Sequence, residues 1–134
     1  MNNFFKSFSE IKKFNKISID YKKIVFFSEN NNYSYFFKSI VDRLVLEGVK
    51  ITYVTADQND FFLKYKDPNF KIVCISSFFL LQYFFSNLKC KNLILTMPDL
   101  GTGILNRSPF CEKYIYIFHS LISTNVAYKE KSFN

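Results

Sequence analysis

Five short apolar runs, separated by polar and helical stretches, constrain this chain more than any other feature. They cover residues 24–28, 50–55, 70–75, 92–97 and 114–118. Runs this short and this rich in β-branched and aromatic residues are typical of strands, and the unbroken run at 114–118 suits a strand covered on both faces. Strands that alternate with helices predict an α/β fold, here a Rossmann-like, doubly wound, mostly parallel sheet of about five strands.

The segments between the runs have helical periodicity. Residues 33–47 place apolar side chains on one face, and Gly48 follows where glycine commonly ends a helix. With the strands on either side, this helix makes a βαβ unit whose crossover should be right-handed. A helix over 78–88 is apolar almost all round, which indicates burial on more than one side or contact with a membrane or partner.

The chain opens with an amphipathic segment. Over residues 3–16, Phe4, Phe8, Ile11 and Phe14 recur at helical spacing among lysines, which predicts an N-terminal helix. Such a helix can pack against its own domain or lie on an anionic membrane surface, and both interpretations stay open. We therefore divide the chain into a helix and linker, residues 1–22, and an α/β domain, residues 23–134.

Length and composition limit the class of protein. The 134 residues suffice for one domain, and a content of 49% hydrophobic residues excludes a disordered chain. No apolar stretch is long enough to span a bilayer, and the N-terminus lacks the features of a signal peptide, so we expect a cytoplasmic protein. The net charge of +7 comes mostly from lysine, which lacks the fork with which arginine reads bases, so we predict no nucleic-acid partner.

The cysteines do not suggest a metal site. Cys74, Cys90 and Cys111 are widely spaced, form no C-x-x-C pair, and could be joined by one histidine only. We interpret them as buried small residues. We accordingly predict no metal and no cofactor.

Polar residues gather where the fourth and fifth predicted strands end. The fourth is followed by a turn that contains Asp99 and Gly101, and the fifth by His119, Ser120 and Ser123. Because ligands bind outside the carboxyl ends of strands in open α/β sheets, the two segments could line one cleft. His119 can take a proton from an alcohol when a carboxylate orients it, and Asp99 is the best candidate for that carboxylate.

Plainer interpretations stay open for these residues. His119 could merely pack or cap a helix, and the turn at 98–103 could be an ordinary connection. The asparagine-rich loop after the first strand includes Asn31, a candidate substrate contact, but it has no glycine for close approach to a pyrophosphate, so NAD is not expected. A Ser-His-Asp hydrolase is not favoured, because no G-x-S-x-G motif is present.

A family resemblance rests on three segments, KKIVFFSENNNYSYFFKSIVDRLVLEGVKITYVT, LILTMPDLG and YIYIFHSLISTNVAYKEKSFN. Together they resemble the N-terminal, acceptor-side domain of the CDP-glycerol glycerophosphotransferase family, the teichoic-acid primases and polymerases of GT-B fold. The resemblance covers roughly residues 23–134. In that family a histidine in a Trp-His-Gly-Thr-Pro type motif is taken to activate the acceptor hydroxyl. His119 matches it, although Phe118 replaces the Trp and Ser-Leu-Ile replaces Gly-Thr-Pro.

The resemblance implies a transferase of cell-wall or surface polymer synthesis. Its donor would be a CDP-activated polyol or sugar, and its acceptor would be lipid-linked, which agrees with a lysine-rich surface at the inner face of the membrane. Such enzymes hold the donor on a second Rossmann-like domain, which this sequence does not reach, so we expect the chain alone to be inactive. The alternative is a non-catalytic α/β module that binds a protein partner or an anionic membrane surface.

Overall fold

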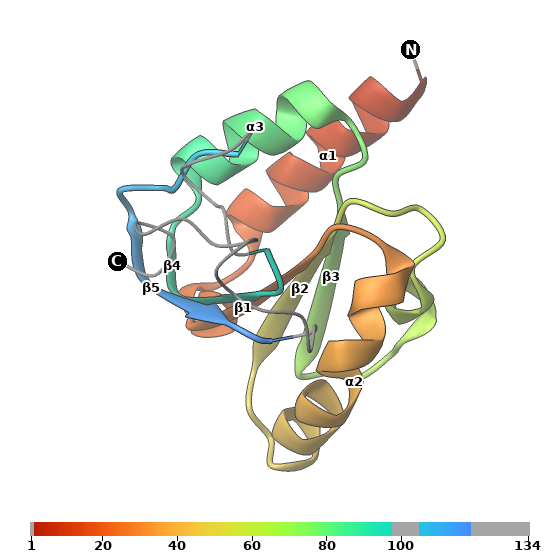
Figure 1. Ribbon diagram of the computed structural model, residues 1–134, viewed down its shortest axis with the longest axis vertical. Helices are drawn as coiled ribbons and strands as arrows, with labels where there is room; N and C mark the ends of the chain where they lie inside the picture. The colour runs from red at the N-terminus through yellow and green to blue at the C-terminus, as the bar shows by residue number, and fades with distance from the viewer. Residues whose placement is uncertain (1, 98–104, 119–134) are drawn as a thin grey trace.

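The computed structural model describes residues 2–97 and 105–118, which form a five-stranded parallel sheet with helices on both faces (Figure 1). The strands lie in the order β3-β2-β1-β4-β5. In chain order the elements are α1 (Asn2–Lys16), the 3-10 helix η1 (Ile19–Lys22), β1 (Ile24–Ser28), α2 (Asn31–Leu46), β2 (Ile51–Thr55), the 3-10 helix η2 (Phe61–Lys64), β3 (Phe70–Cys74), α3 (Phe78–Asn87), β4 (Cys90–Leu95) and β5 (Cys111–Tyr116).

The sheet is doubly wound. From β1 the chain builds outward through β2 to β3, and it then returns to the other side of β1 to add β4 and β5. The direction of winding therefore reverses between β1 and β4, as in Rossmann-like folds. The predicted fold class, with its parallel sheet and N-terminal helix, is confirmed.

Alternate side chains of the strands build a core on each face of the sheet. Val25 and Phe27 of β1 belong to the cluster under α1 and α3, whereas Phe26 belongs to the cluster under α2. On the first face the Phe27 ring packs edge-on against Phe85, with 4.7 Å between ring centroids. On the second face Tyr53 is fully buried among aromatic rings, and its ring centroid lies 4.4 Å from that of Phe62.

The N-terminal helix α1 packs on the domain through its second half. Ile11 and Phe14 are buried, and the Ser7 hydroxyl accepts hydrogen bonds from the amides of Ser76 and Ser77, each at 3.1 Å. These amides lie just past the end of β3, so the turns before Ser7 extend beyond the sheet. Consequently Phe4 and Phe8, which the periodicity assigned to the same apolar face, are exposed.

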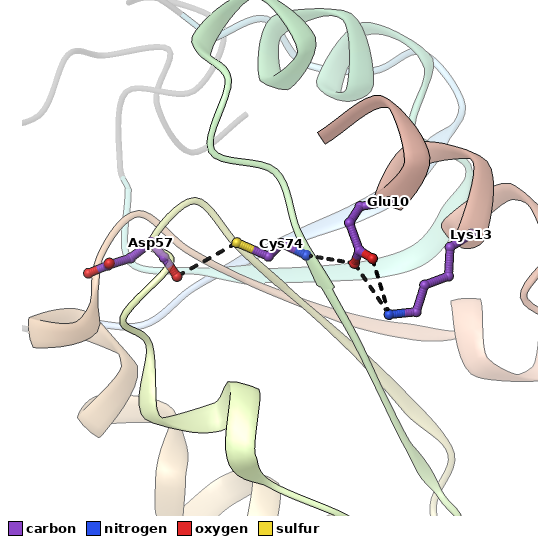
Figure 2. A network of polar contacts seen from close by, with 4 residues as sticks. All are labelled: Glu10, Lys13, Asp57 and Cys74. Atoms are coloured by element: carbon purple, nitrogen blue, oxygen red, sulfur yellow. Dashed lines mark hydrogen bonds and ion pairs between the residues drawn. The ribbon is translucent and has the colours of Figure 1, made fainter. Parts of the chain in front are cut away.

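Figure 2 shows how the same helix is tied to β3. The Glu10 carboxylate accepts a hydrogen bond from the Cys74 amide at 3.1 Å and also pairs with Lys13 at 3.3 Å. The amide belongs to the last residue of edge strand β3, so α1 supplies an acceptor that no neighbouring strand offers there.

Strands β4 and β5 begin earlier than the sequence predicted. The expected ranges were 92–97 and 114–118, whereas the observed pairing starts at Cys90 with Cys111. Lys91 in β4, and Glu112 and Lys113 in β5, interrupt the apolar pattern, so the first halves of these strands were not recognised from the sequence. We also predicted that the last strand is covered on both faces. This is wrong for its described residues, because Ile115 of edge strand β5 is 43% exposed.

We predict that Ser7→Ala lowers the free energy of unfolding by about 1–3 kcal/mol, because two amides at the start of α3 lose their acceptor. Ser9→Ala, at an exposed serine of the same helix, should change it by less than about 0.5 kcal/mol. Urea unfolding followed by circular dichroism measures both. Equal effects of the two substitutions would show that Ser7 does not anchor α1.

Candidate functional site

The carboxyl edge of the sheet between β1, β4 and β5 is where the predicted site should lie. Leu95 of β4 pairs with Tyr116 of β5, and the Ile117 amide donates to the Leu95 carbonyl at 2.8 Å. The chain therefore leaves β4 and β5 from neighbouring positions at one edge. That edge adjoins the reversal of winding between β1 and β4, the usual ligand crevice of such sheets.

Five of the six predicted site residues lie outside the described residues, namely Asp99, Gly101, His119, Ser120 and Ser123. Their roles stay predictions. What the structure does place are the flanking positions, Met97 after β4 and Phe118 after β5, which follow adjacent parallel strands. This adjacency is what the hypothesis of a shared cleft requires.

Asn31, the sixth predicted residue, lies in the first turn of α2. Its side-chain oxygen accepts a hydrogen bond from the Phe61 amide at 3.0 Å, and its own amide donates to the Asp57 carboxylate at 2.9 Å. Asn30 caps the same helix, because its side chain accepts from the Asn32 amide at 2.9 Å. The side-chain oxygen of Asn31 thus links α2 to η2, while its contact with a substrate stays a prediction.

Sequence reasoning missed a buried polar network beside this edge. The carboxyl group of Asp60 accepts from the Ser34 hydroxyl through one oxygen and from the Phe62 amide, at 2.9 Å, through the other. The Ser34 hydroxyl lies 3.0 Å from that of Ser28, at the end of β1. The Tyr53 hydroxyl lies 3.5 Å from the Asp60 carboxylate, and burial raises the pKa of this tyrosine well above its usual value. Only the capping position of Asp60 before η2 could have signalled the network in advance.

This network is structural. Every buried side-chain nitrogen and oxygen among the described residues has a hydrogen-bond partner, as expected for groups that hold the fold together. The network joins the first turn of α2 to η2, to the end of β1 and to Tyr53 in the middle of β2.

Cys74, also at the carboxyl edge, is a partly buried thiol with a raised pKa. Burial, followed by the nearby carboxylates of Glu10 and Asp57, raises its pKa to about 11. Its sulfur points toward the Asp57 carbonyl at 3.8 Å (Figure 2). Because the thiolate is the nucleophilic form, Cys74 is not a catalytic candidate at neutral pH.

Pockets on the described surface include one beside β3 and one at the amino edge of the sheet. One, of about 530 Å³, lies beside β3 and is lined by residues that include Lys13, Gln58 and Cys74. The other, of about 630 Å³, lies at the opposite, amino edge of the sheet. Its lining combines lysines with apolar side chains and one carboxylate, from Ile17, Ile19, Lys22, Lys23, Lys89, Cys90, Lys91, Phe110 and Glu112. Within the described ranges no three His, Cys, Asp or Glu side chains group to hold a metal ion.

An exposed aromatic face lies where α1 and α3 begin. We define it by Phe4, Phe5, Phe8, Phe78 and Phe79, all of which are exposed. The two helix ends lie together, because Ser7 is bonded to the residues that precede α3. Since α3 follows β3, this face borders the carboxyl edge of the sheet. Clustered exposed aromatic side chains mark surfaces that contact a partner, a membrane or another domain.

Comparisons with protein-family models, curated proteins and solved structures gave no match. No helix in the described part of the chain is long and apolar enough to cross a bilayer. The structure establishes the fold, and the family resemblance stays a prediction from the sequence.

We predict that Asp60→Ala lowers the free energy of unfolding by about 2–4 kcal/mol, because Ser34 and the Phe62 amide lose a buried acceptor. Glu47→Ala removes an exposed ion pair with Arg43 and should cost about 0–1 kcal/mol. Thermal and urea unfolding compare the two. A loss for Asp60→Ala no larger than that of the control would contradict the structural role of the network.

Proposed function

We propose that the chain is the acceptor-side half of a two-domain transferase that uses a CDP-activated polyol or sugar, with His119 as general base. The proposal is supported by the segments that resemble the CDP-glycerol glycerophosphotransferase family. The observation that carries it is the adjacency of β4 and β5 at the carboxyl edge, beside the reversal of winding. In the sequence, Asp99 follows β4 and His119 follows β5.

The proposed chemistry needs one proton acceptor on this domain. The acceptor hydroxyl oxygen bonds to the transferred group, the nucleotide leaves with the electrons of the broken bond, and the imidazole of His119 takes the hydroxyl proton. Asp99 orients the imidazole. Ser120, Ser123, Gly101 and Asn31 are the proposed contacts to the substrate.

The aromatic face gives this proposal a place for the second domain. Donor and acceptor must be held in line, and such positioning can contribute about 7–11 kcal/mol to catalysis. A GT-B enzyme achieves it in a cleft between two domains. Exposed phenylalanines at the starts of α1 and α3 lie past the carboxyl end of β3, at the same edge of the sheet as the ends of β1 and β4.

We predict that residues 1–134 fold cooperatively but catalyse no transfer. Thermal unfolding tests the first point, and a transfer assay with a lipid-linked acceptor tests the second. Calorimetric titration with CDP-glycerol should show no binding at micromolar strength, because the donor site belongs to the other domain. Turnover, or tight donor binding, would show that the whole site lies within these residues.

We predict that His119→Ala lowers turnover by about 100-fold to 10,000-fold in a form of the protein that carries the donor-binding domain. The unmodified enzyme should lose activity in acid, because a protonated imidazole cannot accept the proton. Asn106→Ala, at an exposed position, serves as the control. Turnover that survives His119→Ala would remove the proposed base.

A second candidate function is docking on an anionic membrane surface without catalysis. The observation that favours it is the mixture of exposed aromatic and basic side chains on α1. Phe4, Phe5 and Phe8 are exposed, and the Lys12 amine lies 4.7 Å from the centroid of the Phe8 ring. Aromatic side chains can enter the headgroup region, while each lysine near an anionic surface contributes about 1 kcal/mol.

We predict for this second candidate that the chain sediments with phosphatidylserine-containing vesicles but not with neutral ones. Substituting Phe4 and Phe5 by Ser should weaken binding about tenfold or more, because it removes apolar area. Phe110→Ser, at an exposed ring on another surface, should bind normally. If no vesicles bind, membrane docking is refuted, and the aromatic face would instead contact a second domain or a protein partner.

A further inference from the structure

Cys90 and Cys111 lie together at the amino ends of β4 and β5. They are register partners on neighbouring strands, their Sγ atoms are 3.2 Å apart, and both residues are buried. The widely spaced sequence positions gave no sign of this pairing. Only the alignment of two parallel strands brings the thiols into contact.

The strand geometry permits a bond between them. Neighbouring strands lie about 4.8 Å apart, and a disulfide usually joins residues whose Cα atoms are about 4.4–6.8 Å apart. The two sulfurs need to approach by roughly 1 Å to reach bonding distance, which small side-chain rotations can supply. The backbone of the sheet can stay in place.

We propose that Cys90 and Cys111 form a reversible dithiol–disulfide site, which a small anionic disulfide of the glutathione class oxidises through the lysine-lined pocket. Cys90 lines this pocket of about 630 Å³, so the site has an entry path from solvent. The proposal is independent of the transferase function, since it concerns the opposite edge of the sheet.

The pair is chemically suited to exchange. The Cys90 thiol donates a hydrogen bond to the Cys111 sulfur, and this bond lowers the pKa of Cys111 to about 7. The same contact and burial raise the pKa of Cys90. The contact thus shifts Cys111 toward the thiolate, which is the form that attacks a disulfide. The pKa of Cys74 is instead raised to about 11, so this thiol serves as an internal control.

The lining of the pocket favours an anionic reagent. Its lining includes four lysines and one carboxylate, that of Glu112, and one of these lysines, Lys23, is paired with Asp20 at 2.8 Å. Lys22 and Lys89 are close enough that the charge of Lys89, after the effect of burial, lowers the pKa of Lys22. A concentration of like charge in a partly enclosed space attracts anions and speeds their arrival.

The reaction balances within the named reactants. One cysteine thiolate attacks a sulfur of the incoming disulfide, forms a mixed disulfide and releases one small thiolate. The second cysteine loses its proton and attacks the mixed disulfide, which releases the other small thiol. Two electrons and two protons pass from the protein to the reagent, and the protein keeps one new S–S bond.

The bond would fasten edge strand β5 to β4. It would also close the chain between positions 90 and 111 into a loop, and this loop includes Asp99 and Gly101. A closed loop restricts the unfolded chain, so the oxidised protein should be the more stable form.

The test uses the full chain in glutathione buffers of varied redox ratio, followed by alkylation and mass spectrometry. We expect an oxidised species about 2 Da lighter, the two hydrogens lost, in which Cys74 is alkylated and Cys90 is linked to Cys111. Its melting temperature should rise by about 5 °C or more and return on reduction. Three alkylated cysteines in every buffer, or a lasting glutathione adduct without the internal bond, would overturn the proposal.

Variants separate the site from its entry path. Cys74→Ser should keep the oxidised form, whereas Cys90→Ser and Cys111→Ser should each abolish it; the wild-type result stands even if a variant fails to fold. Lys89→Glu should slow oxidation by oxidised glutathione several-fold relative to Lys66→Glu, which lies outside the pocket, but should not slow oxidation by the cationic disulfide cystamine. Equal rates for the two lysine variants would refute the pocket as the route.

Discussion

Strand β1 is the element on which the rest of the structure depends. It pairs with β2 on one side and β4 on the other, and its central residues, Val25 to Phe27, are almost wholly buried. Both faces must therefore be covered, one by α1 and α3 and the other by α2. The reversal of winding beside β1 follows from this central position, because later strands can join the sheet only at its open edges.

Polar contacts at the carboxyl edge join the helices to the ends of the strands. On one side, Asp60 and Ser34 join η2 to α2, and on the other, Ser7 and Glu10 join α1 to the end of β3. Each contact satisfies a group that the end of a strand or helix would otherwise leave unpaired. The proposed transferase site would thus lie next to backbone that is already fixed, which is what positioning of an acceptor demands.

The predictable parts of the molecule are those set by local pattern. Strand β1 and the helix ending before Gly48 follow from apolar runs and a glycine with positive φ. The first halves of β4 and β5 could not be found, because pairing rather than hydrophobicity places Lys91 and Lys113 in strands. The Asp60 network and the pair of thiols were invisible for a similar reason, since each depends on contacts between distant segments. For the candidate site, sequence named the residues and structure located only their flanks and Asn31.

Edge strand β5 connects the two proposals. At its amino end it holds Cys111 against Cys90, and at its carboxyl end it leads to Phe118 and then His119. Among the described strands it pairs with β4 alone, so the positions of both of its ends depend in part on this one ladder of backbone hydrogen bonds. Edge strands are held on one side only and open more readily than central ones. A covalent link at the amino end would oppose that opening and would therefore favour the alignment of β4 and β5 on which a shared cleft relies.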